Sequence, residues 1–193
     1  MRISIIFTIL YICVSIPPTS YGSQKPFSNL TFGASYSSII KPNLYSVSGE
    51  FEKTDGFSFD VKIPAGIGFI DVGFERESDE SSYEDLYVHR NKTANNIAYI
   101  GYSYCYTDSE ILRIYPGLRL GNYAINSTST YNGNKSTYNK SFAFAALAVR
   151  VHINIFERLG AFVDGSIKHV FMEDDPQLLL KLHCGLNYTL KIR

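Results

Sequence analysis

The sequence predicts an all-β fold, namely an eight-stranded antiparallel up-and-down transmembrane β-barrel. Apolar residues recur at every second position along most of the chain, which is the period of a strand, and no segment after the first 22 residues has a persuasive helical period. Tight turns alternate with longer polar connections. The amphipathic segments are about 9 to 13 residues long, enough to cross a bilayer when tilted. Together these observations predict strands that span a membrane.

The first 22 residues (1–22) are predicted to be a signal peptide. Arg2 gives the segment a positive start, and residues 3–16 form an apolar run closed by two prolines. That run is too short to span a membrane as a helix and has the length of a signal-peptide core. Small residues just before Ser23 predict cleavage there, which leaves residues 23–193 as one barrel domain. A single anchoring helix is the alternative.

Eight segments of the chain show the two-residue period. They are residues 28–38, 55–63, 67–77, 95–106, 111–124, 141–155, 160–171 and 178–190. Tight turns are predicted at 64–66, 107–110 and 156–159, and longer polar loops around 39–54, 78–94 and 125–140, with a shorter one at 172–177. The loop at 125–140 is rich in Asn, Ser, Thr, Tyr and Lys, so we expect it to remain solvated. Short turns at one end and long loops at the other are typical of membrane barrels.

Each segment has one apolar and one polar face. Leu118 and Val149 lie on apolar faces, whereas the neighbouring Arg119 and Arg150 lie on polar faces. Alternation alone does not distinguish a membrane barrel from a soluble one, whose apolar face points inward. Strand length, glycines among the charged positions and tyrosines near strand ends favour the membrane arrangement. Those tyrosines are Tyr36, Tyr102, Tyr104, Tyr106 and Tyr188.

Ten charged residues share the inward parity of the predicted barrel. They are Asp60, Lys62, Asp71, Glu75, Arg113, Arg119, Arg150, Asp164, Lys168 and Lys181. An eight-stranded barrel is just wide enough for side chains to fill it, and an unpaired buried charge costs several kcal/mol. We therefore predict a structural network of ion pairs in the interior, with a gated polar pathway as the functional alternative.

The last segment resembles the C-terminal strand of the small eight-stranded outer-membrane proteins of the OmpA and OmpX type. The matching residues, in order, are His183, Gly185, Tyr188 and Leu190. The chain departs from this pattern at residues 191–193, where many members end in Phe. The resemblance implies an outer-membrane location, contact with membrane lipid and lipopolysaccharide, and recognition of this segment by the barrel-assembly machinery.

No residues are assigned to catalysis, to a cofactor or to a metal. The balance of 18 basic and 18 acidic side chains argues against a nucleic-acid partner. The histidines of the strands lack metal-ligand spacing, and no serine has a recognisable base and acid. The acidic stretch 77–85 lacks the oxygen spacing of a calcium loop, so it is predicted to be a solvated face. Cys105 and Cys184 are predicted to lie on opposite faces and not to pair.

Three functions remain in view. The first is a non-enzymatic outer-membrane scaffold whose loops serve adhesion, envelope integrity or host interaction, with the loop partner unassigned. The second is an outer-membrane enzyme that modifies lipids. The third is a soluble secreted barrel that binds a small apolar ligand.

Overall fold

The computed structural model describes residues 29–42, 51–66, 68–84, 88–108, 111–131, 134–172 and 177–191. These contain the strands β1 (Asn29–Pro42), β2 (Phe51–Ala65), β3 (Gly68–Glu84), β4 (Val88–Tyr104), β5 (Thr107–Asp108), β6 (Leu112–Tyr131), β7 (Asn134–Asn154), β8 (Leu159–Val170) and β9 (Gln177–Lys191). The predicted signal peptide lies outside the described residues. No helix among the described residues is long and apolar enough to cross a membrane.

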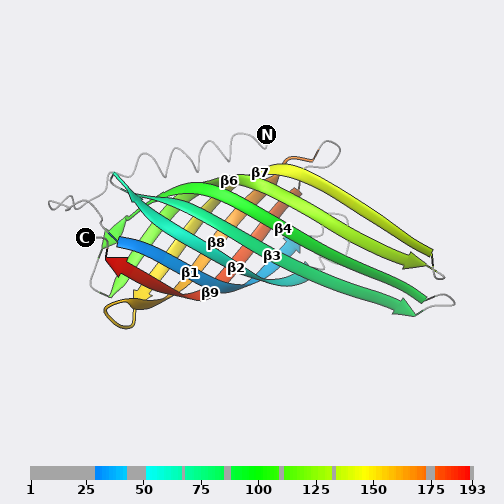
Figure 1. Cartoon of the computed structure of the whole chain (residues 1–193), viewed down its shortest axis with the longest axis horizontal. Helices are drawn as coiled ribbons and strands as arrows, with labels where there is room; N and C mark the ends of the chain where they lie inside the picture. The colour runs from blue at the N-terminus through cyan, green and yellow to red at the C-terminus, as the bar shows by residue number, and fades with distance from the viewer. Residues whose placement is uncertain are drawn as a thin grey trace.

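The strands form one closed antiparallel barrel. Each long strand pairs with the strands next to it in sequence, β1 pairs with β9, and β4 pairs directly with β6. The short strand β5 only extends the edge of β6, so the wall consists of eight long strands (Figure 1). Because antiparallel closure leaves no unpaired edge around the barrel, the backbone polar groups of the wall are satisfied. The predicted fold class is confirmed.

A bulge interrupts the wall between β4 and β5. Ser103 lies opposite Gly117, whereas Thr107 lies opposite Ile114, so this side of the pair has one residue more than β6. Pro116 lies within the interruption. A residue without a backbone N–H is tolerated at such a bulge even in an otherwise regular strand.

The two ends of the barrel differ in length. At one end the connections are tight, including a turn in which Gly66 has a φ of 61° and the bend at residues 155–158. At the other end β3, β4, β6 and β7 continue past the remaining strands (Figure 1). We call this extension the protruding sheet. It comprises residues 78–84, 88–94, 125–131 and 134–141.

The protruding sheet corrects the prediction of long loops around 78–94 and 125–140. Of these segments, only residues 85–87 and 132–133 lie between strands. These strands were not predicted because neither of their faces is apolar. Apolar and polar residues therefore do not alternate along them. Ser, Thr and Tyr still pair well across strands, as in the hydrogen bond between Thr93 and Ser127 at 3.2 Å.

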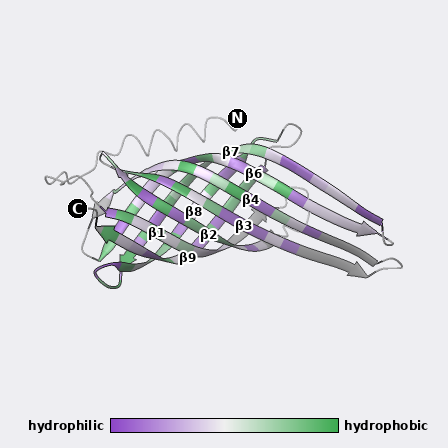
Figure 2. Ribbon diagram, in the orientation of Figure 1, coloured by the Kyte–Doolittle hydropathy of each residue, from purple (hydrophilic) through white to green (hydrophobic). Residues whose placement is uncertain are grey.

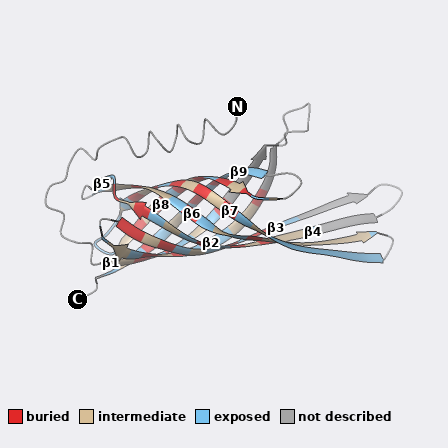
Figure 3. Ribbon diagram, turned by 90° about the horizontal axis from the view of Figure 1, so that it is seen from above, coloured by how far each residue is buried: buried red, intermediate tan, exposed pale blue. Residues whose placement is uncertain are grey.

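The barrel turns its apolar face outward. Leu118 is 45% exposed and Val149 48%, whereas Arg119 is 5% exposed and Arg150 4%. Figure 2 shows apolar and polar residues alternating along the wall, and Figure 3 shows buried and exposed positions alternating in the same way. This is the arrangement of a transmembrane barrel and the reverse of a soluble one.

Other predictions about the two faces also hold. Of the five tyrosines predicted to face outward, Tyr104 is half-buried. The other four are exposed, as predicted from their parity: Tyr36, Tyr102, Tyr106 and Tyr188. Cys105 is buried, Cys184 is exposed, and no disulfide joins the two.

Candidate functional site

The barrel interior holds a balanced set of buried charges. Among the described residues, five carboxylates and five cations are buried: Asp60, Asp71, Glu75, Glu77 and Asp164, with Lys62, Arg119, Arg150, Lys168 and Lys181. Each comes from an inward position of β2, β3, β6, β7, β8 or β9. The equal numbers of acids and bases allow the interior to be both dry and neutral, as a filled barrel requires.

The buried charges form three layers along the barrel, and the first layer lies toward the end with tight turns. Lys62 Nζ donates to Asp71 Oδ1 at 2.6 Å and to the Ser103 hydroxyl at 2.9 Å. The Ser103 hydroxyl in turn donates to Asp71 at 3.2 Å. The ammonium group also lies 5.1 Å from the ring centroid of Tyr115. The lysine charge is thus compensated by one carboxylate and one aromatic face.

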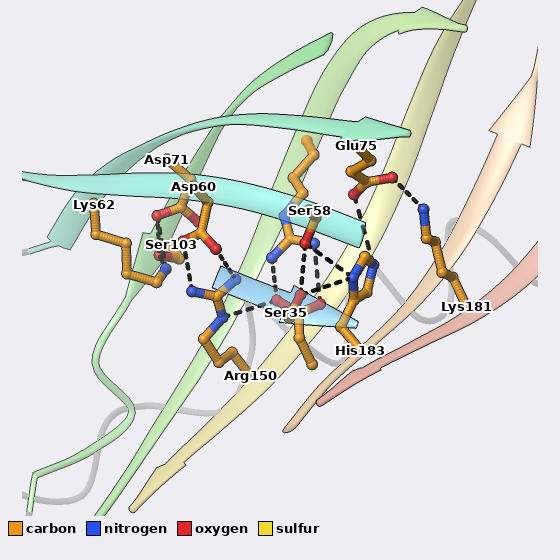
Figure 4. A network of polar contacts seen from close by, with 12 residues as sticks. Ser35, Ser58, Asp60, Lys62, Asp71, Glu75, Ser103, Arg150, Lys181 and His183 are labelled. Carbon is orange, nitrogen blue, oxygen red and sulfur yellow. Dashed lines mark hydrogen bonds and ion pairs between the residues drawn. The ribbon is translucent and has the colours of Figure 1, made fainter. Parts of the chain in front are cut away.

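Two arginines occupy the middle layer. Arg150 binds both oxygens of Asp60, at 2.6 and 3.0 Å, and its Nε donates to Asp164 at 2.9 Å. Arg119 binds the same Asp164 through both terminal nitrogens. Bidentate bonds of this kind are among the strongest in proteins. They connect β2, β6, β7 and β8 across the centre of the barrel (Figure 4).

The third layer is centred on two glutamates of β3. Lys181 binds both Glu75 and Glu77, and Lys168 donates to Glu75 at 3.1 Å. Lys168 also lies 4.6 Å from the ring centroid of Phe144. His183 Nε2 approaches Glu75 Oε1 at 3.6 Å. This layer connects β3 to β8 and β9, which face it across the barrel.

A serine–histidine contact lies between the middle and third layers. The hydroxyls of Ser35 and Ser58 are 2.6 Å apart, and His183 Nδ1 lies 3.3 Å from the Ser58 oxygen (Figure 4). Glu75 lies on the other side of the imidazole ring, so the three residue types (serine, histidine and a carboxylate) match those of a hydrolase triad. However, Ser58, His183 and Glu75 are each less than 5% exposed, and Glu75 is already paired with two lysines. A site closed to substrate favours a structural role for these residues.

Aromatic side chains close the interior near its ends. Phe69 and Tyr115 pack edge to face at 5.6 Å toward the tight turns. Tyr99, Tyr123 and Phe144 form a buried apolar cluster toward the protruding sheet. Their bulk is accommodated by small residues: a Cβ at position 73, for example, would overlap the ring of Tyr99. The interior is therefore packed with side chains.

Most of the predicted interior residues come together in these layers. Nine of the ten are buried and paired with an opposite charge. Arg113 is only half-buried, near the tight turns, where its backbone lies opposite His152 and Asp108. Asn187 bonds the ring of His152 at 3.2 Å. Arg113 has contacts of its own, but it is not one of the buried charges of the three layers.

Glu77 is an interior residue that was not predicted. The acidic stretch 77–85 was expected to be a solvated face, but the Glu77 side chain is fully buried and binds Lys181. The signal was present, because Glu77 continues the odd-numbered inward parity of Asp71 and Glu75. The stretch begins in the barrel and continues as strand to Glu84.

The four residues predicted as an assembly signal lie on β9, which pairs with β1 and closes the barrel. His183 points inward and is buried, whereas Tyr188 and Leu190 are exposed on the outer face. Gly185 lies opposite Ser35, and a Cβ there would approach the Ser35 side chain to 2.5 Å. The glycine thus allows β9 and β1 to approach closely at the closing seam.

Solved structures share this architecture. Ail, the attachment invasion locus protein of Yersinia pestis, has a TM-score of 0.60 at 14% identity, over 84% of this chain and 99% of that one. A major outer membrane protein from Thermus thermophilus has a TM-score of 0.58 at 11% identity, over 85% and 100%. This chain has the fold of the small outer-membrane β-barrels. The resemblance to the OmpA and OmpX type, stated from the last strand, is confirmed at the level of the fold.

The likeness to outer-membrane barrels is one of structure and not of sequence. No protein-family model matches the chain, and no curated protein matches it. A second Ail structure, in complex with the heparin analogue sucrose octasulfate, has a TM-score of 0.58 at 12% identity, over 84% of this chain and 98% of that one.

Proposed function

We propose that this outer-membrane barrel is a non-enzymatic anchor that holds the protruding sheet outside the cell for contact with an extracellular partner. The observation that carries the proposal is the division of the long strands into two parts. Their barrel halves have an apolar outer face suited to lipid, and their outer halves have no apolar face and are suited to water. Residues 1–22 are removed on export in this proposal, and the assembly machinery recognises the end of β9.

The protruding sheet has the composition of a recognition surface. Tyr131 and Tyr138 are 46% and 47% exposed. Both lie on the face that continues the barrel interior, among Ser127, Ser136 and Asn134. Tyrosine offers a large rigid contact area at low entropic cost, while Ser and Asn provide adaptable hydrogen bonds. The ammonium of a lysine, Lys140, lies 5.5 Å from the Tyr138 ring centroid.

A glycan with anionic groups is the partner that this face supports best. Hydroxyl and amide side chains match the hydroxyls of a sugar, and Lys140 offers a charge-assisted bond to a sulfate. The Ail complex with a heparin analogue shows that a barrel of the same fold takes such a ligand. The lipid-modifying enzyme has no comparable support, because the one serine–histidine contact described above is enclosed in the barrel.

The location is tested by fractionating cells that express the full chain. The protein is expected in the outer membrane and should resist carbonate extraction. Its gel mobility should differ before and after boiling, because a closed barrel with its backbone hydrogen bonds satisfied resists detergent when cold. Its mass should correspond to a chain that begins at Ser23. Recovery of an uncleaved chain, or of a soluble protein, contradicts this part of the proposal.

Binding is tested with immobilised heparin as the probe and the protein in lipid nanodiscs. Replacing Tyr131 and Tyr138 together with alanine is expected to weaken binding by about tenfold or more, since hot-spot tyrosines contribute about 1–2 kcal/mol or more each. Tyr106→Ala, on the outer face near the opposite end, is the matched control and should leave binding unchanged. If the double variant binds heparin as strongly as the wild type does, the glycan binds another surface of the protein.

A further inference from the structure

The protruding sheet has two open edges. Pairing between β2 and β3 ends at Ser78, so residues 79–84 of β3 pair only with β4. Pairing between β7 and β8 begins at Phe144, so residues 134–143 of β7 pair as a strand only with β6. Among the described residues, no strand covers the outer side of either segment. Open edges present rows of unpaired N–H and C=O groups, which favour pairing with another strand.

The directions of the two edge strands suit a second copy of the same chain. β3 runs from the tight turns toward the protruding end, and β7 runs back (Figure 1). Copies inserted in one membrane share their orientation. The β3 edge of one copy and the β7 edge of a neighbour therefore meet antiparallel, with the outer faces of both sheets on the same side. Two β3 edges, or two β7 edges, would meet parallel, which is a slightly less stable pairing.

The charges of the two edges are complementary. The β3 edge contains Asp79, Glu80 and Glu84 and has no basic residue, whereas the β7 edge contains Lys135 and Lys140 and has no acidic residue. The antiparallel register that places Asp79 opposite Lys140 also places Glu84 opposite Lys135, because both pairs are five residues apart. The parities agree as well: Asp79 and Lys140 share the face that continues the barrel interior, and the other two positions share the outer face.

We propose that copies of this protein associate side by side in the membrane, with residues 79–84 of β3 in one copy paired antiparallel to residues 135–140 of β7 in the next. This inference rests on the membrane insertion proposed above, but not on the glycan partner. The contact is heterologous, so it builds rows or rings and not only dimers. Lysines on the β7 edge disfavour a neutral or basic strand and select for the acidic edge.

A carbodiimide that joins carboxylates to amines at zero length tests the contact in intact outer membranes that contain the full chain. Within one copy the two edges are separated by β4 and β6, roughly 14 Å across three strand spacings, so a cross-link between them has to join two copies. The wild type should give dimers and higher species on denaturing gels. Mass spectrometry should map the links to Asp79–Lys140 or Glu84–Lys135.

A charge swap makes the test specific. The variant Asp79→Lys/Glu84→Lys has two edges of net positive charge, since only Glu80 remains acidic, and Lys135→Glu/Lys140→Glu has two acidic edges. Each alone should lose cross-linked species by about tenfold, because attraction of up to about 1 kcal/mol per pair becomes repulsion and the reagent no longer finds a carboxylate opposite an amine. Co-expression of the two should restore them, since each variant then finds an opposite edge. Arg158→Glu reverses a charge at an exposed position in the bend at residues 155–158, at the opposite end of the barrel from both edges, and it should associate like the wild type.

The outcomes separate this inference from the proposed function. A wild type that reaches the outer membrane but remains monomeric overturns the association alone. Single variants that cross-link as well as the wild type, or a mixture that is not restored, also overturn it. A chain that never reaches the outer membrane overturns the proposed insertion.

Discussion

Replacing Arg150 with alanine is expected to lower the free energy of unfolding by about 3–5 kcal/mol, the typical cost of removing one partner from a buried ion pair. Arg150 donates two hydrogen bonds to Asp60 and one to Asp164, and its guanidinium lies 4.1 Å from the ring centroid of Phe162. Without it, Asp60 keeps a charge in a dry interior and has no hydrogen-bonded cation among the residues that the structure describes. Asp164 is affected less, because Arg119 still binds it.

Urea unfolding of the protein folded into lipid vesicles measures this cost. Lys135→Ala is the matched control, because this exposed cation of the protruding sheet should contribute less than about 1 kcal/mol. Adding Asp60→Asn to Arg150→Ala should recover part of the loss, since the uncompensated charge is removed. Equal unfolding midpoints for Arg150→Ala and Lys135→Ala would mean that water already solvates the interior.

Replacing Leu118 with arginine is expected to lower the free energy of unfolding in lipid by about 2–4 kcal/mol, the cost of an arginine on the lipid face near the bilayer midplane. Leu118 is exposed on the outer face in the barrel half of β6, opposite Leu147 of β7 and Tyr102 of β4. The cost arises from the bilayer, because this side chain points outward from the wall and is 45% exposed.

The control for Leu118→Arg lies on the same strand and the same face. Thr128→Arg is ten residues further along β6, in the protruding sheet. It should change the free energy of unfolding by less than about 0.5 kcal/mol, because a surface position tolerates an arginine in water. If Leu118→Arg proves as harmless as Thr128→Arg, the apolar face does not contact lipid.

The barrel was predictable from the sequence because successive side chains of each strand face two different environments, the apolar outside and the polar interior. Leu118 next to Arg119, and Val149 next to Arg150, reveal the face of each strand without knowledge of its neighbours. The same parity places nearly every buried charge, including Glu77, which was missed only because acidic residues follow it. Which charge pairs with which was not predictable. Asp60 and Arg150 are 90 residues apart, and their contact depends on the curvature of the whole barrel.

The protruding sheet was not predictable from the same signal. Residues 125–131 and 134–141 have water on both faces, so no alternation indicates a strand. Their pairing follows from the registers that β4, β6 and β7 already adopt in the barrel, which simply continue outward. The serine–histidine contact escaped prediction for a related reason, since Ser35, Ser58 and His183 lie on three strands that meet only on closure.

Both the fold and the proposed function require that lipid surrounds the apolar face of the barrel and that the charged face is enclosed. The chain contains no tryptophan, so a single introduced tryptophan reports on its own position. We expect brominated lipids to quench the fluorescence of Val149→Trp strongly, because Val149 is exposed on the outer face, and to leave Phe144→Trp, on the buried face of the same strand, nearly unquenched. Equal quenching at both positions, or stronger quenching at position 144, would contradict the account.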